Sequence, residues 1–144
     1  MGNLRVQGNP SGSGTHTLQG TSSNSSRTAT LPDGDETLGY INAPQNSQTG
    51  ATYTLVITDQ GDHIYFTGGT TATLTVPLNS AVAFPIGTAI LVLNNNSGSL
   101  TISSSATLQL AAGSTGNRTV ASKGMASLLK VATDTWWVSG AGVT

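Results

Sequence analysis

The sequence predicts an all-β fold: an antiparallel β-sandwich or barrel-like domain of about nine short strands, preceded by an extended N-terminal β-hairpin arm. Forty of the 144 residues are Ser or Thr, and many of them lie inside apolar runs. In residues 51–58 and 70–76, polar β-branched side chains alternate with apolar ones, as in strands with one buried and one wet face. Turn-forming residues interrupt such runs about every 8–12 residues, a spacing typical of sandwiches and barrels.

The expected strands are residues 52–58, 63–67, 71–76, 88–94, 99–103, 107–110, 118–121, 125–131 and 135–139. The segments between them are rich in Gly, Asn and Asp, which favour tight turns. Because most of these connections are short, we expect neighbouring strands to be mostly antiparallel. An apolar period near 3.6 never extends beyond one turn, and we expect residues 78–84 to form a loop or a short helical turn.

Residues 1–50 are expected to form an arm and linker, and residues 51–144 the β domain. Gly and Ser fill much of residues 8–14 and 20–26, so the arm lacks the apolar residues for a core of its own. Two β-prone runs, residues 16–18 and 27–31, predict a hairpin that must lie against another surface. A polar linker is expected at residues 43–50.

Composition argues against several classes of function. The net charge is −1, and the five Lys and Arg residues are scattered, so we expect no nucleic-acid partner. No apolar stretch approaches the roughly 18 residues that span a bilayer, and the first residues lack the apolar core of a secretory signal. We therefore expect no membrane partner. Without Cys, disulfides and thiolate metal sites are excluded.

The chain offers little for catalysis, and we expect no enzyme activity, no cofactor and no metal site. A Gly-x-Ser-x-Gly motif and a Ser or Thr with a matching base and acid are missing. The acidic residues Asp33, Asp35 and Glu36 are interpreted as a solvated turn rather than a calcium loop. Asp59, Asp62 and His63 are interpreted as a turn and a strand edge, since zinc binding or catalysis needs further ligands.

The aromatic residues leave two questions open. They are not interleaved with basic residues, so they do not predict a base-stacking platform, although a weak carbohydrate-binding role stays open. Trp136 and Trp137 are adjacent and must point to opposite faces of the last expected strand. One indole is therefore expected to close the core, while the other either caps a loop or contacts a subunit.

Three segments, residues 53–66, 73–88 and 127–140, resemble a β module that is common in structural proteins of tailed bacteriophages. In that module a YTL…D.G strand precedes a TVP..S...FP.GT loop and a closing K..T..WW..G hairpin. The resemblance covers nearly all of residues 51–141. Residues 14–18 and 26–33 also resemble an element that often precedes the module in phage tail and fibre proteins.

The resemblance implies a non-enzymatic virion protein. Tail fibres usually carry the module within a much longer chain, so a 144-residue chain with its own Met1 favours a head decoration or cement protein that binds and stabilises the assembled capsid. Such proteins resemble one another in being trimers, which implies a homotrimer bound to the major capsid protein. We expect it to be made in the host cytoplasm and to lie on the outer surface of the head.

The alternative is a tail fibre or tail-tip subunit that binds host glycans. A carbohydrate hydrolase fragment is a third candidate, disfavoured because the β domain lacks paired carboxylates. The residues expected to contact the capsid or a neighbouring subunit are Thr15, His16, Thr17, Leu18, Arg27, Thr28, Ala29, Thr30, Leu31, Trp136 and Trp137.

Overall fold

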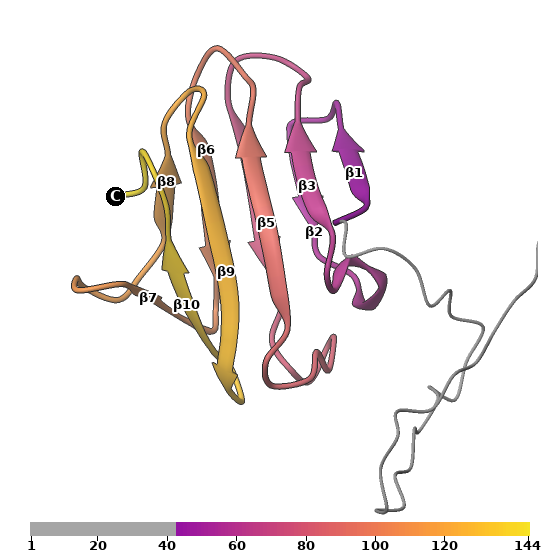
Figure 1. Cartoon of the computed structure of the whole chain (residues 1–144), viewed down its shortest axis with the longest axis vertical. Coiled ribbons are helices and arrows are strands. Elements are labelled where there is room, and N and C mark those ends of the chain that lie inside the picture. The colour runs from indigo at the N-terminus through magenta and orange to yellow at the C-terminus, as the bar shows by residue number, and fades with distance from the viewer. Residues whose placement is uncertain (1–42) are drawn as a thin grey trace, which may run out of the picture. The chain divides into compact units, whose positions relative to one another are not determined.

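The computed structural model describes residues 43–144, which form two β-sheets packed face to face (Figure 1). The six-stranded sheet has the order β1-β3-β5-β9-β10-β7, and the four-stranded sheet has the order β2-β4-β6-β8. The prediction of an all-β fold is confirmed. The elements are β1 (Gln45–Gln48), β2 (Thr52–Thr54), the 3₁₀ helix η1 (Ile57–Asp59), β3 (His63–Phe66), β4 (Ala72–Val76), β5 (Ala89–Asn94), β6 (Leu100–Ser104), β7 (Thr107–Leu110), β8 (Arg118–Val120), β9 (Met125–Ala132) and β10 (Thr135–Ser139).

The first six strands alternate between the two sheets, so the chain winds in coils. Strands β1, β3 and β5 lie side by side and parallel in the six-stranded sheet. Strands β2, β4 and β6 do the same in the four-stranded sheet. The chain between β1 and β6 therefore makes three coils of a two-sided β-roll. Beyond β6, the antiparallel strand β8 ends one sheet, and the β9–β10 hairpin separates β5 from β7 in the other.

The expectation of mostly antiparallel neighbours is wrong. Five of the eight strand pairings in the described part of the chain are parallel. The physical reason is that the short connections join strands of different sheets rather than neighbours in one sheet. Each chain segment crosses to the other sheet and returns before it pairs, and this path produces parallel neighbours.

The predicted strand positions agree with β3 to β10 to within one residue at either end. Two segments differ from expectation. The residues expected as one strand at 52–58 divide into β2 and η1, because the Asp59 carboxylate accepts a hydrogen bond from the Val56 N–H (2.8 Å) and holds the chain in a turn. The segment expected as a polar linker contains β1, which pairs with β3.

Successive coils also pair through the turns that connect the two sheets. The N–H of Thr67 donates to the Gln48 carbonyl (2.9 Å), and the N–H of Asn95 donates to the Phe66 carbonyl (2.8 Å). This close stacking excludes side chains at two turn positions. A Cβ at Gly68 would overlap the carbonyl of Thr49, and a Cβ at Gly98 would overlap the carbonyl of Thr70.

The buried side chain of Asn94 ties several of these turns together. Its amide nitrogen lies 2.9 Å from the carbonyl oxygen of Gly98 and 3.0 Å from those of Val120 and Ala121, and it donates to them. Its oxygen accepts the N–H of Asn96 (3.1 Å). The third coil is thereby fixed to the segment that leads into β9.

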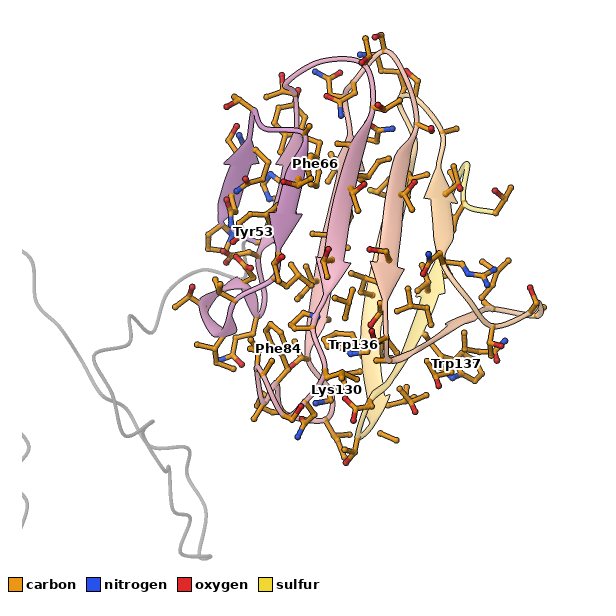
Figure 2. The ribbon with its side chains drawn as sticks, turned by 180° about the vertical axis from the view of Figure 1, so that it is seen from behind. Tyr53, Phe66, Phe84, Lys130, Trp136 and Trp137 are labelled. Atoms are coloured by element: carbon orange, nitrogen blue, oxygen red, sulfur yellow. The ribbon has the colours of Figure 1, made fainter. Side chains whose placement is uncertain are left out.

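One end of the core is closed by Trp136, Phe84 and a buried lysine (Figure 2). The Trp136 and Phe84 rings meet edge to face, with centroids 5.6 Å apart. Lys130 Nζ lies 6.0 Å from the Trp136 ring centroid and donates to the Phe84 carbonyl (2.6 Å) and to the Asn79 side chain. These contacts offset the cost of burying the charge and hold the loop between β4 and β5 over the core.

We predict that Gly98→Ala destabilises the fold, because the new methyl group must push apart the turns of the second and third coils. The free energy of unfolding should fall by about 1–3 kcal/mol, as for other overpacked sites. Gly50→Ala is the matched control, since its Cβ would meet nothing closer than 3.8 Å. Urea unfolding followed by circular dichroism measures both variants. Equal midpoints for the two variants would contradict the stacking argument.

Candidate interaction surface

The outer face of the four-stranded sheet is covered by hydroxyl groups. The strand register places Thr52, Thr73, Thr101 and Thr119 in one row across the sheet, and Thr54, Thr75 and Ser103 in a second row. Inward positions between them hold buried side chains such as Leu74 and Ile102. Thr suits an exposed strand because it is both β-branched and polar. We call this surface the hydroxyl face.

The outer face of the six-stranded sheet is apolar instead. Strands β3, β5 and β9 bring Tyr65, Leu93 and Met125 into one row. Leu91 lies in the next row, between the polar side chains of His63 and Ser127, and Ala89, Leu129 and Trp137 make a third. Trp137 is 51% exposed, Met125 47% and Leu129 44%. We call the surface made by Tyr65, Leu91, Leu93, Met125, Leu129 and Trp137 the apolar face.

The apolar face carries no formal charge. Strands β3, β5, β9 and β10 contain a single Lys, Arg, Asp or Glu residue, and that residue is Lys130, which points into the core. Lys123 lies beyond the strand ends, where its Nζ donates to the Asn95 carbonyl (3.0 Å). A partner that covers these six side chains therefore buries no unpaired ion among them, although it approaches Lys123 at the end of the face.

The apolar face has a recess at one end and a projection at the other. A hollow of about 300 Å³ lies where the turns meet the ends of β5 and β9, lined by Tyr65, Leu93, Met125 and Lys123 among others. Trp137 lies on β10, beside Leu129 in the register, whereas the hollow lies beside Met125. The exposed indole and the hollow are thus separated along β9 by four residues.

The tryptophan pair divides as predicted. Trp136 is buried in the core, so it does not face a partner directly, whereas Trp137 lies on the apolar face. A role for Trp137 in a subunit contact stays a prediction. The other expected contact residues, Thr15 to Leu18 and Arg27 to Leu31, lie outside the described residues, as do Asp33, Asp35 and Glu36.

Asp59 serves the fold at the first coil. Its carboxylate accepts hydrogen bonds from the Tyr53 hydroxyl (3.0 Å) and from the Asn46 amide (2.8 Å), besides the Val56 N–H. His63 Nδ1 lies 2.8 Å from the Ala43 carbonyl oxygen. Within residues 43–144, no three His, Cys, Asp or Glu side chains are grouped so as to hold a metal ion.

Two groups near this cluster have shifted acidities. Burial raises the pKa of Tyr53, and its hydrogen bond to Asp59 adds to that shift. Burial also raises the pKa of Asp62, and the neighbouring Asp59 carboxylate raises it further.

The sequence contains a signal for the apolar face. Residues 89–93 of β5 and residues 128–131 of β9 are apolar on both faces of the strand, apart from Lys130, and continuous apolar runs are typical of strands that are covered on both sides. The four-stranded sheet can cover only one side. The apolar residues on the other side are therefore not needed for the packing of the two sheets.

Comparison with protein-family models, curated proteins and solved structures found no match. Among residues 43–144, no helix has the length and apolar character needed to cross a membrane.

We predict that Asp62→Asn stabilises the protein at neutral pH. Because the folded state raises the pKa of Asp62, ionisation of this carboxyl opposes folding, and stability is lost as pH rises from the usual range of Asp, about 4, through the raised pKa. Thermal unfolding at pH 3 and pH 7 should show a gain for the variant at pH 7 only. Asp59→Asn should have the opposite effect and destabilise the fold at pH 7. The new amide NH₂ group would face the Asn46 amide and the Val56 N–H, which are hydrogen-bond donors and need an acceptor.

Proposed function

We propose that this chain is a non-enzymatic structural protein of a tailed-phage virion that binds the outer surface of the assembled head and stabilises it. The observation that carries the proposal furthest is the contrast between an uncharged apolar face and a hydroxyl face on one small domain. The apolar face is suited to contact with another protein, and the hydroxyl face is suited to contact with water. The resemblance of residues 51–141 to the phage β module supports the same class of protein.

A decoration protein binds a preformed shell at many symmetric positions. A homotrimer presents three copies of each weak contact, and simultaneous engagement of several major capsid protein subunits converts them into a strong total hold. In this proposal the segments Thr15–Leu18 and Arg27–Leu31 supply the capsid contacts. The hydroxyl face keeps the outside of the particle hydrated in a chain with only 8% charged residues.

A tail fibre or tail-tip subunit that binds host glycans is the second candidate. The β-roll favours it in one respect. Among residues 43–144, β1 and β2 are the outermost strands of their sheets and belong to the same coil, so in this part of the chain both sheets end together. A further parallel coil can pair with such edges, as happens in elongated repeat proteins.

We predict that a chain lacking residues 1–42 stays folded and β-rich but no longer sediments with phage heads. Residues 43–144 contain both sheets and the core, whereas the proposed capsid contacts lie in the removed segment. Leu18→Asp combined with Leu31→Asp in the full chain should weaken binding in the same direction. Thr119→Asp, on the hydroxyl face, is the control and should bind normally.

Two results would redirect the proposal. Full occupancy of heads by the truncated chain would make the β domain the anchor. Binding of the full chain to host cells or purified surface glycans, with none to heads, would favour the tail fibre subunit.

A further inference from the structure

We propose that three copies of this chain assemble with their apolar faces turned toward a common axis, and that Trp137 of each copy occupies the hollow of the next. The inference rests on the homotrimer of the proposed function and names the surface that forms it. The hydroxyl faces then lie on the outside of the trimer.

The size of the apolar face supports a protein contact. Leu91, Met125, Leu129 and Trp137 are between 38% and 51% exposed, and Tyr65 and Leu93 are partly buried. At roughly 150–250 Å² per side chain, the six residues together present on the order of 400–500 Å² of apolar surface. Patches of this size on single subunits often mark interaction sites. Neighbouring small residues such as Ser127 and Ser139 extend the contact toward the ~800 Å² per partner of a standard interface.

Charge and shape favour a second copy as the occupant. Because the six side chains of the face are uncharged, two copies bring no like charges together there, and the charge beside the face, Lys123, meets the indole rather than another cation. The face also carries both halves of a contact, since the indole of Trp137 projects from β10 while the hollow lies beside β3 and β5. A ring needs two different patches, one for each neighbour, and the projection and the recess lie on opposite sides of β9.

The chemistry of the hollow suits an indole ring. Tyr65 and Leu93 offer apolar contact, and the Met125 thioether packs favourably against aromatic rings. Lys123 lines the hollow as well and brings a cation close to the incoming ring.

The first experiment measures the mass of the purified full chain by light scattering. We expect three times 14.5 kDa for the wild type and a shift to monomer for Trp137→Ser. Trp137 is half exposed, so its loss leaves the core intact, and circular dichroism should be unchanged. Ile86→Ser is the matched control, because Ile86 is 67% exposed but lies in the loop before β5; it should remain trimeric.

The second experiment cross-links thiols in a chain that has no Cys. Ser47→Cys lies beside Tyr65 at the recess, and Ser139→Cys lies on β10 near Trp137, so both variants retain the contact itself. Within one copy the two positions are four strand spacings apart, about 19 Å. A shorter thiol cross-linker therefore joins different copies only, and the double variant should give covalent trimers on a denaturing gel.

Ser139→Cys paired with Thr119→Cys, which lies on the hydroxyl face, should give no cross-linked trimer. A monomeric or dimeric wild type, a trimer that survives Trp137→Ser, or efficient cross-linking of Ser139→Cys alone would overturn the inference. None of these measurements involves phage particles. Failure to bind heads would therefore count against the proposed function and leave this test unaffected.

Discussion

The structure depends on backbone hydrogen bonding between successive coils of the β-roll. Strands pair with the coil before and after them in both sheets, and the turns pair as well. This arrangement requires each coil to stay one strand spacing, about 4.8 Å, from the preceding coil in the turns as well as in the strands. Gly68 and Gly98 make that spacing available where a side chain would collide with the preceding turn. The inner faces then form one shared core with Ile64, Leu74 and Ile102 at 0% exposure.

Coil stacking leaves the two outer faces free to differ, because neither contributes to the shared core. One face holds rows of Thr and Ser, while the other exposes Leu91, Leu129 and Trp137. Inward-facing residues of each strand form the core, and these apolar side chains alternate with them and point outward. Folding of the domain therefore does not require the outward positions to be apolar. Their exposure leaves apolar surface in contact with water, and in the proposed trimer association buries it. The asymmetry is thus one of the grounds for the proposed assembly.

The sequence predicts where the strands lie along the chain better than it predicts which strands pair with each other. Turn residues mark where the chain bends, which placed β3 to β10 closely, but they do not indicate which sheet the next strand joins. β1 escaped prediction because its four side chains are all polar and show no apolar alternation. Lys130 could be assigned to the inner face from alternation with Leu128, but its contacts come from a loop about fifty residues away. The sequence predicts that Trp136 and Trp137 lie on opposite faces of the sheet, because adjacent residues of a strand point to opposite sides.

The two ends of the β-roll argue for lateral assembly over growth along its axis. At the first coil of the described residues, Asn46, Tyr53 and Asp59 close the core with a hydrogen-bonded polar network. At the other end the antiparallel strands β8 and β9 interrupt the parallel stacking. Within the described residues, the edges at β1 and β2 offer backbone hydrogen bonds to a further strand. Because hydrophobic burial is the main driving force for association, we propose the apolar face as the stronger contact, and this proposal favours sideways assembly over end-to-end stacking.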